Sequence, residues 1–399
     1  MEDKVIYLDN NATTRCADEV LEAMLPFFRE YYGNPSSIHT FGGRVAGEVE
    51  DARRSFAGLV GAGYRNMKGQ ASEIIFTSCG TESDSSAIRS AVATNAPRRR
   101  IVTTKVEHPA VLNLCRELAR QGYEIVTVGV DDRGRLRMDE FDKAVDANTA
   151  VVSVMWANNE TGTIFPVEEL AARAHAKGAL FHTDAVQAVG KIPMDLSATE
   201  IDFASFSGHK INAPKGIGAL YIRRGVRFRP FLIGGHQESG RRGGTENVPY
   251  IVGLGAAARL ARENMAAEIA DTSRLRDMLE EGVRETIPAI RINGDTEHRL
   301  PNTSSISFEG IEGESILMHL DRYGICASSG SACTTGSLEP SHVLRAMGLP
   351  YTAAHGTIRF SFSRDNRDED VKKVLEVLPG IISGLRELSP FWDGEKVKR

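Results

Sequence analysis

Between Ser72 and Arg223 the chain alternates short apolar runs with amphipathic segments, which is typical of βαβ units with parallel strands. Seven apolar runs are expected to be strands: Glu73–Thr77, Ile101–Thr104, Glu124–Val128, Ala150–Trp156, Ala179–Thr183, Asp202–Phe206 and Gly218–Ile222. Between some of them, Ala110–Arg120 and Val167–Ala176 carry apolar residues at helical spacing. The pattern predicts an α/β fold whose seven-stranded sheet is flanked by helices.

The pattern changes after Pro249, where a long helical stretch runs from Ile251 to about Thr286. The segments behind it indicate a smaller α+β domain with the strands Ser304–Phe308 and Thr357–Phe362 and the helices Gly313–Tyr323 and Glu369–Leu388. Two further helices, Asp18–Tyr32 and Arg44–Val60, are expected before the sheet. We expect a large domain of residues 16–260 and a small domain made of residues 1–15 and 261–399.

Composition places the chain among soluble globular proteins. Its 399 residues are 41% hydrophobic and 25% charged, which excludes a disordered chain, and this length favours two domains. A formal net charge of −5 gives no overall attraction to nucleic acid or to an anionic membrane. No apolar run approaches the roughly 20 residues of a membrane span, and the polar start MEDKVIYLDNN is unlike a signal peptide. We expect a cytoplasmic protein that binds neither nucleic acid nor membrane.

The five cysteines are Cys16, Cys79, Cys115, Cys326 and Cys333, and no two of them form a C-x-x-C pair. An odd number without such pairs argues against a disulfide framework and against a zinc ribbon. Thiols in a reducing compartment are mostly inert core residues, so a functional one has to be distinguished by its surroundings.

A turn of small residues, Ser78–Ser83 (SCGTES), leads from the first strand into a helical pattern. Backbone N–H groups at such a helix start form an anion site that suits a phosphate, and Gly80 and the Thr81 hydroxyl would contribute to it. The alternative interpretation is an ordinary helix cap.

Lys210 comes directly after the strand Asp202–Phe206, in the segment Phe206–Lys210 (FSGHK). Ligands of α/β proteins bind at the carboxyl ends of strands, although a lysine there can also be a plain surface charge. Together with a phosphate-binding turn, this lysine points to pyridoxal phosphate, which is held as a Schiff base to lysine with its phosphate at a helix N-terminus.

Pyridoxal phosphate needs an acid opposite its pyridine nitrogen, and Asp184 is the candidate. The strand period of two puts His182 and Asp184 on one face, where the Asp184 carboxylate can pair with the protonated ring nitrogen. The rival interpretation makes these two residues metal ligands, but no third ligand follows at helical or strand spacing.

Nine motifs, in the same order and over nearly the whole chain, resemble those of the NifS/IscS cysteine desulfurases of the class-V aminotransferase family. They are Asp9–Thr14, Gly33–His39, Thr81–Ser83, Glu107–Ala110, Asn158–Gly162, Asp184–Gln187, Ser207–Lys210, Gly244–Glu246 and Ser329–Cys333. Variants in Cys79–Ser85, Trp156–Thr161 and Arg241–Asn247 are more similar to the nitrogen-fixation NifS type than to the housekeeping IscS type.

The resemblance implies the fold of type I pyridoxal-phosphate enzymes: a mostly parallel seven-stranded sheet with helices on both faces, plus a smaller α+β domain. It implies that Lys210 forms the Schiff base and later moves protons at the substrate Cα, and that His108 stacks on the pyridine ring. Asp184 would hold the ring nitrogen, and Asn159 and Gln187 would bond the phenolic oxygen. The implied phosphate ligands are Gly80, Thr81, Ser207 and His209, with Thr245 reaching in from the partner subunit of a homodimer.

The resemblance also assigns the substrate, L-cysteine. Arg359, in the segment Thr357–Ser361 (TIRFS), would clamp its carboxylate with a planar fork, aided by Asn34. The alternative is a surface arginine, since a core arginine without a partner is costly to bury.

Cys333 lies in a small, polar, Gly-rich segment, and the catalytic loop is expected at about residues 325–340. By resemblance its thiolate attacks the substrate sulfur and holds it as a persulfide, leaving L-alanine. The implied acceptor is an iron–sulfur scaffold protein, with nitrogenase maturation as the role suggested by the NifS-like motifs. No metal site is expected from the protein alone, apart from a transient iron–sulfur cluster on Cys333.

Three alternatives stay open from the sequence. Cys333 could be an inert exposed thiol, the chain could be another enzyme of the same fold such as a selenocysteine lyase or an aminotransferase, or it could be a non-catalytic scaffold. Intact Lys210, Asp184 and His108 argue against the scaffold, and the loop around Cys333 argues against the other enzymes. The stretch Gly63–Gln70 resembles a small insertion relative to the family.

Overall fold

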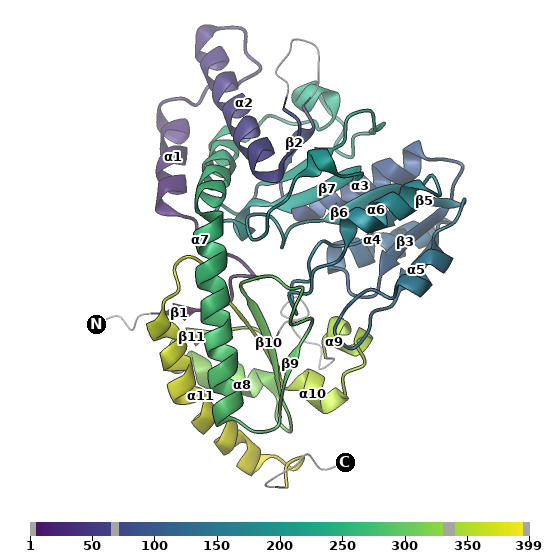
Figure 1. Ribbon diagram of the computed structural model, residues 1–399. Coiled ribbons are helices and arrows are strands. Elements are labelled where there is room, and N and C mark those ends of the chain that lie inside the picture. The colour runs from purple at the N-terminus through teal and green to yellow at the C-terminus, as the bar shows by residue number, and fades with distance from the viewer. Residues whose placement is uncertain (1–4, 65–71, 330–339, 394–399) are drawn as a thin grey trace.

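A computed structural model of the protein describes residues 5–64, 72–329 and 340–393. All seven predicted strands are present and form one sheet in the order β2-β8-β7-β6-β5-β3-β4 (Figure 1). The strands are β2 (Ile74–Thr77), β3 (Arg100–Thr104), β4 (Glu124–Val128), β5 (Thr149–Ser153), β6 (Leu180–Asp184), β7 (Phe203–Ser207) and β8 (Gly218–Ile222). Only β8 runs antiparallel to the other six strands, so the prediction of a mostly parallel sheet is confirmed.

Helices cover both faces of this sheet because neighbouring residues of each strand enter different hydrophobic clusters. Ile75 and Val151 pack against helices α3 (Gly80–Thr94) and α4 (Pro109–Arg120), whereas Ile74 and Val152 belong to the cluster on the other face. The helices of this part are α1 (Asp18–Arg29), α2 (Thr40–Val60), α3 (Gly80–Thr94), α4 (Pro109–Arg120), α5 (Met138–Ala144) and α6 (Val167–His175).

A second core lies around a three-stranded antiparallel sheet of order β12-β10-β9. Its elements are β9 (Ile290–Asn293), β10 (Thr303–Phe308), β12 (Thr357–Ser361), α8 (Gly313–Asp321) and α11 (Asp368–Leu388). Two short helices that precede β12 in the chain, α9 (His342–Ala346) and α10 (Tyr351–His355), place Val343, Leu344 and Ala354 in the large core instead. The N-terminal strand β1 (Ile6–Tyr7) pairs in parallel with β11 (Ile325–Cys326), which brings the start of the chain to this core. Sequence periodicity did not reveal β1 and β11, because two residues are too few for a repeat.

Helix α7 (Val248–Thr286) connects the two cores without a break and runs down the molecule in Figure 1. Its first half, including Leu254 and Ala258, packs into the large core with α1 and α2. Leu275 and Leu279, further along, belong to the second core. The predicted long helix is therefore present, and it spans the place where we put the boundary near residue 260. That division into domains stays a prediction.

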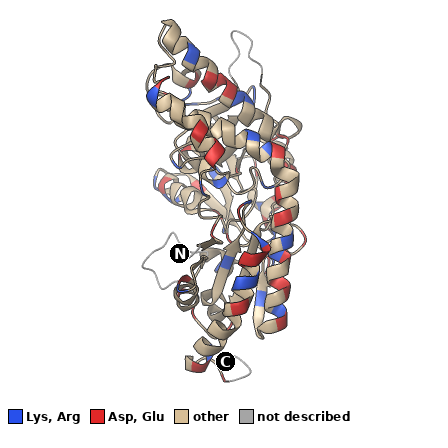
Figure 2. Ribbon diagram, turned by 90° about the vertical axis from the view of Figure 1, so that its left-hand side faces the viewer, with Lys and Arg blue, Asp and Glu red and all other residues tan. Residues whose placement is uncertain are grey.

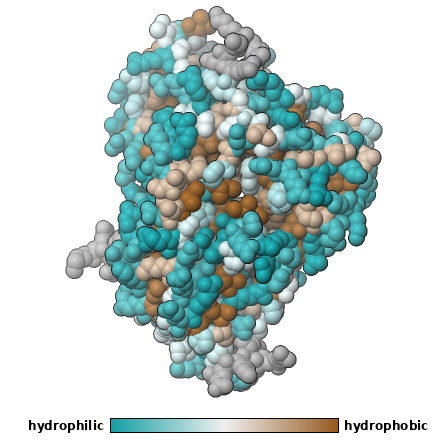
Figure 3. Space-filling view, viewed as in Figure 1, coloured by the Kyte–Doolittle hydropathy of each residue, from teal (hydrophilic) through white to brown (hydrophobic). Residues whose placement is uncertain are grey.

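Charged residues of both signs are interleaved over the face shown in Figure 2, and neither sign gathers into a single patch. The face in Figure 3 is mostly polar at its edges and shows apolar residues near its centre. Among the helices of the described residues, none combines the length and the apolar character needed to cross a membrane.

Candidate active site

Ten of the residues singled out from the sequence line one cavity of about 270 Å³. They are Gly80, Thr81, His108, Asn159, Asp184, Gln187, Ser207, His209, Lys210 and Arg359. Most of them follow the carboxyl ends of β2, β3, β5, β6 and β7, which meet at one edge of the sheet because these strands are parallel. Arg359 comes from β12, so both sheets contribute to the cavity.

Lys210 ends the short turn η2 (Gly208–Lys210) that follows β7. Gly208 is needed there, since a Cβ at this position would lie 2.8 Å from Cγ2 of Ile217. The Lys210 Nζ atom donates hydrogen bonds to the backbone oxygens of Asn11 (2.5 Å) and Ala12 (2.7 Å). The amine is therefore held at the cavity wall by the N-terminal segment of the chain.

Asp184 is the last residue of β6, and its Oδ1 atom accepts a hydrogen bond from the backbone N–H of Val186 (3.0 Å). Burial raises the pKa of Asp184 to about 6, and the nearby Asp84 acts in the same direction while His108 opposes it. A buried acid of this kind gains from a cationic partner, so the carboxyl is suited to a protonated ring nitrogen in the cavity.

His108 caps helix α4 by accepting a hydrogen bond from the backbone N–H of Ala110 on its Nδ1 atom (3.2 Å). Pro109 at the first helical position needs no such partner, because it has no N–H. Burial lowers the pKa of His108, and the charge of Lys210 adds to this effect while Asp184 opposes it. The ring is therefore neutral near pH 7, and its position beside the cavity is fixed by the helix cap.

The start of α3 forms the other end of the cavity. Gly80 has no side chain, and a Cβ at this position would lie only 2.9 Å from Cγ2 of Val186 and 3.5 Å from Cβ of Ser207. The glycine therefore keeps this end of the cavity open. Nearby, His209 bonds the Thr13 hydroxyl through Nδ1 (3.1 Å), and burial lowers the pKa of His209 to about 4. A helix N-terminus lined by Thr81 and Ser207 hydroxyls has the donors that a phosphate requires.

Arg359 is buried, with 3% of its surface exposed, so the alternative of a surface arginine is wrong. One guanidinium nitrogen donates to Oδ1 of Asp9 (2.6 Å) and the other to the backbone oxygen of Asn159 (3.1 Å). Its Nε atom has no hydrogen-bond partner within the described part of the chain. A buried donor without a partner is costly, and a carboxylate in the cavity could accept from it.

Two described residues that the sequence analysis assigned to the site, Thr245 and Asn34, do not line this cavity. Thr245 lines a neighbouring pocket together with Ser78 and Arg242, and Asn34 is exposed in the loop between α1 and α2. Cys333 and most of the predicted catalytic loop lie outside the described residues, as does most of the stretch Gly63–Gln70. Within one chain, therefore, Thr245 does not join the predicted phosphate ligands, and Asn34 does not join Arg359 in the cavity.

The sequence analysis missed the central role of Asn11. Its backbone oxygen accepts hydrogen bonds from Lys210 and from Nε2 of Gln187 (2.9 Å), and its side chain donates to the backbone oxygen of Asn159 (3.1 Å). The motif Asp9–Thr14 marked the segment but not its contacts, since these partners lie more than a hundred residues away in the sequence.

His182 is fully buried behind Asp184 and is not a ligand of the cavity. Its ring nitrogens bond the hydroxyls of Ser153 (2.8 Å) and Ser205 (2.9 Å), and burial lowers its pKa to about 4. In the described residues, the only group that could hold a metal is Asp295, Glu297 and His298, of which the last two are exposed and the first already pairs with Arg135. The structure thus gives the metal interpretation of His182 and Asp184 no support.

The four described cysteines are free thiols. Burial raises the pKa of Cys115 to about 12 and also raises the pKa of Cys16 and of Cys326, so these three are poor thiolates. Cys79 lines the cavity as the cap residue of α3.

Glu107, next to His108, leads to a prediction about stability. It is fully buried, accepts hydrogen bonds from Thr104 and Met155 on one oxygen only, and burial raises its pKa from the ordinary 4.5 to about 8. The folded chain therefore binds a proton that the unfolded chain has lost, and stability falls as the pH rises between these two values.

We expect the melting temperature to fall by several degrees between about pH 6 and pH 9, and to fall less in Glu107→Gln. Thermal unfolding of both proteins across this range checks the expectation, with the exposed Glu48→Gln as control. Equal slopes for Glu107→Gln and the parent would mean that this carboxyl is already ionised in the folded protein.

Comparison with known proteins agrees with the resemblance inferred from the motifs. Residues 6–374 match the aminotransferase class-V family. A cysteine desulfurase of Gluconacetobacter diazotrophicus is 61% identical over 98% of this chain and 96% of its own length. The cysteine desulfurase NifS of Azotobacter vinelandii is 55% identical over 98% of this chain and 95% of its own length.

Two solved structures are similar as well. A NifS-like protein superposes with a TM-score of 0.88 at 41% identity, over 96% of this chain and all (100%) of that one. A structure described as SspA in complex with cysteine gives a TM-score of 0.78 at 33% identity, over 90% of this chain and 98% of that one. Similarity of this extent, over nearly the full length, shows that the chain belongs to the aminotransferase class-V family.

Proposed function

We propose that this chain is a pyridoxal-phosphate-dependent cysteine desulfurase, which converts L-cysteine to L-alanine and takes up the sulfur as a persulfide on Cys333. The observation that carries the proposal is the convergence of Lys210, Asp184 and His108 on one cavity. Relatives named cysteine desulfurases, at 55% to 61% identity, support the same reaction, and the SspA structure with cysteine supports the substrate.

The donor set of the cavity fits pyridoxal phosphate. Asp184 would hold the ring nitrogen and His108 would stack on the ring, while Asn159 and Gln187 would bond the phenolic oxygen. The phosphate would lie at the start of α3, held by Gly80, Thr81, Ser207 and His209. Bound there through Lys210, the cofactor supplies an electron sink that stabilises negative charge at the substrate Cα.

The protein's own residues then position the substrate and move its protons. Arg359 would bind the carboxylate of L-cysteine, for which its Nε atom is the available donor. The Lys210 amine, which the Asn11 and Ala12 carbonyls hold at the cavity, would take the proton from Cα and return it later.

Cys333 would complete the reaction as a thiolate. Its sulfur forms a bond with the substrate sulfur while the bond between that sulfur and Cβ breaks, and the electron pair left on carbon takes up a proton to give alanine. The thiol of Cys333 and L-cysteine thus become a persulfide and L-alanine, with no other oxidant or reductant.

A homodimer is part of the proposal, because Thr245 does not reach the cavity of its own chain. Thr245 of a second copy would bind the phosphate, and Asn34 would act near Arg359 in such an assembly. The exposed apolar side chains of Tyr32, Ile38 and Ile233 are available for a contact between copies.

We further propose that residues 16–260 form a large domain and that the protein is located in the cytoplasm. The sulfur would be delivered to an iron–sulfur scaffold protein, with nitrogenase maturation as the specific role.

The reaction predicts a product ratio. Purified holoenzyme incubated with L-cysteine and excess dithiothreitol should release alanine and sulfide in a ratio of about one to one, because the reductant frees the sulfur of each persulfide. Amino-acid analysis and a sulfide assay on the same sample measure both products. L-Serine, which lacks the sulfur, is the matched control and should give neither. Pyruvate or a keto acid as the main product would instead indicate a lyase or an aminotransferase.

A further inference from the structure

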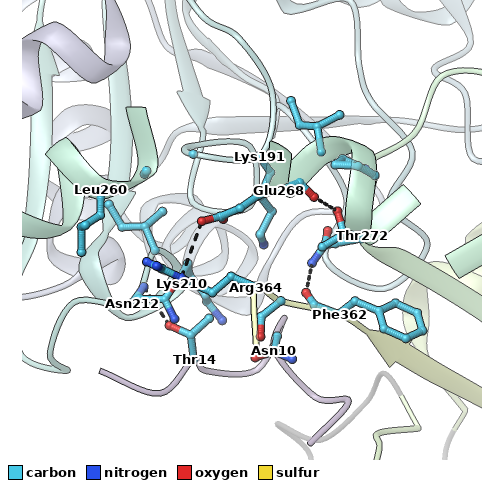
Figure 4. Close-up of a pocket in the computed structure, with 17 residues that line it drawn as sticks. Asn10, Thr14, Lys191, Lys210, Asn212, Leu260, Glu268, Thr272, Phe362 and Arg364 are labelled. Atoms are coloured by element: carbon cyan, nitrogen blue, oxygen red, sulfur yellow. Dashed lines mark hydrogen bonds and ion pairs between the residues drawn. The ribbon is translucent and has the colours of Figure 1, made fainter. Parts of the chain in front are cut away.

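Lys191 is a half-buried lysine that the proposed mechanism does not use. It lies in a small cavity on the far side of Lys210, lined also by Glu268, Thr272 and Arg364 (Figure 4). Gly190 precedes it with φ 72°, and a Cβ there would lie 2.8 Å from Cγ2 of Ile211. This left-handed glycine turns the chain so that Lys191 faces back toward Gln187, four residues earlier.

The contacts of Lys191 determine the orientation of the Gln187 side chain. Its Nζ atom donates to Oε1 of Gln187 (2.8 Å) and, at 3.3 Å, to Oδ1 of Asn11. Nε2 of Gln187 donates to the backbone oxygen of Asn11 (2.9 Å). The Lys191 amine donates to Oε1 of Gln187, and the Asn11 backbone carbonyl can only accept, so a flipped amide would place the Gln187 oxygen against the Asn11 carbonyl oxygen and lose the hydrogen bond from Lys191.

The fixed amide has a consequence for the cofactor cavity, which Gln187 also lines. An amide nitrogen carries two protons, and the Asn11 carbonyl accepts only one of them. In this orientation the NH₂ group, and not the oxygen, is the part of Gln187 that can serve an acceptor in the cavity. The flipped amide would turn an oxygen toward an oxygen of the cofactor.

We propose that Lys191 is a positioning residue, which holds the Gln187 amide so that its NH₂ group donates to the phenolic oxygen of the bound cofactor. This inference rests on the proposed function, because it needs pyridoxal phosphate in the cavity. Burial lowers the pKa of Lys191, and the nearby charges of Lys210 and Arg359 act in the same direction, while Glu268 and Arg364 are the other charged groups that line its cavity.

The test uses the visible absorbance of the lysine-bound cofactor as a function of pH. A hydrogen bond to the phenolic oxygen stabilises the negative charge that this oxygen carries when the lysine–cofactor linkage loses its proton. The hydrogen bond therefore lowers the pKa of that linkage. We therefore expect the titration midpoint of the holoenzyme to rise by about one pH unit in Lys191→Met and in Gln187→Met. The double variant should have the midpoint of Gln187→Met alone, since Lys191 acts through that amide.

Thr272→Val is the matched control, because Thr272 lines the same cavity and its hydroxyl donates only to the Glu268 backbone oxygen among its described hydrogen bonds. It should lower the melting temperature and leave the midpoint unchanged. If Lys191→Met does not fold, Lys191→Leu fills the site with a shorter apolar side chain and has the same expected midpoint.

Additive shifts in the double variant, or an unchanged midpoint in folded Lys191→Met, would overturn the proposed role of Lys191. Failure of the proposed function looks different: the parent protein would then bind no cofactor with a visible absorbance that depends on Lys210. The two failures can therefore be told apart in the same set of spectra.

Discussion

Cys333→Ala is expected to lower sulfide release from L-cysteine by at least about 1,000-fold, because the reaction loses its only sulfur nucleophile. The visible colour of the bound cofactor should stay, since none of the residues proposed to hold it is changed. Sulfide release under single-turnover and steady-state conditions, together with an absorbance spectrum, gives both results. Mass spectrometry of the parent after L-cysteine should also show the mass of one added sulfur, which the variant lacks.

Two other cysteines serve as controls for this variant. Cys16→Ala changes a half-buried thiol outside the cavity and should release sulfide at the parent's rate. Cys79 lines the cavity, so Cys79→Ala tests whether a second thiol takes part. Undiminished turnover in Cys333→Ala would refute the persulfide step on Cys333. If only Cys79→Ala lost sulfide release, Cys79 at the start of α3 would be the nucleophile instead.

Lys210→Ala is the second change with a large expected effect. The variant should lose the visible absorbance of the lysine-bound cofactor and form alanine at least about 10,000-fold more slowly, because attachment and proton transfer at Cα both depend on this amine. Absorbance after addition of pyridoxal phosphate and alanine formation from L-cysteine measure the two losses.

The matched control is Lys215→Ala, an exposed lysine five residues further along the same segment. It should keep both the absorbance and the rate. A Lys210→Ala protein with the parent's spectrum would mean that another amine carries the cofactor, and Lys191, which lies in the cavity behind Lys210, would be the first candidate.

The sequence predicted the large sheet and the main site residues well because both follow from local patterns. Each of the seven apolar runs became a strand, and Asp184 and Lys210 lie at strand ends that parallel topology brings to one edge. The run Ala150–Trp156 was expected to be longer than β5, which ends at Ser153. Val154 and Trp156 still donate to backbone oxygens at His182 and Asp184, so the chain follows β6 while it turns into the site.

Contacts between distant segments could not be predicted in the same way. Asn11, Lys191 and Gln187 form one network, yet nothing in their local sequence shows that the N-terminal segment lies against Lys210. β9 is a further example: it is a partly buried strand of four residues whose pairing with β10 comes from tertiary structure. Such pairings depend on the global fold rather than on periodicity.

The unbroken helix α7 also constrains how the chain can vary in length. Within the 39 residues of this helix, the chain passes from Ala261 in one core to Leu275 in the other with no loop between them. One inserted residue in that interval would rotate everything beyond it by about 100° and advance it by about 1.5 Å, with no turn to absorb the change. Insertions and deletions should therefore be tolerated in surface loops and excluded from this stretch. The uninterrupted helix fixes the distance and the orientation between the core that carries Arg359 and the sheet edge that carries Asp184.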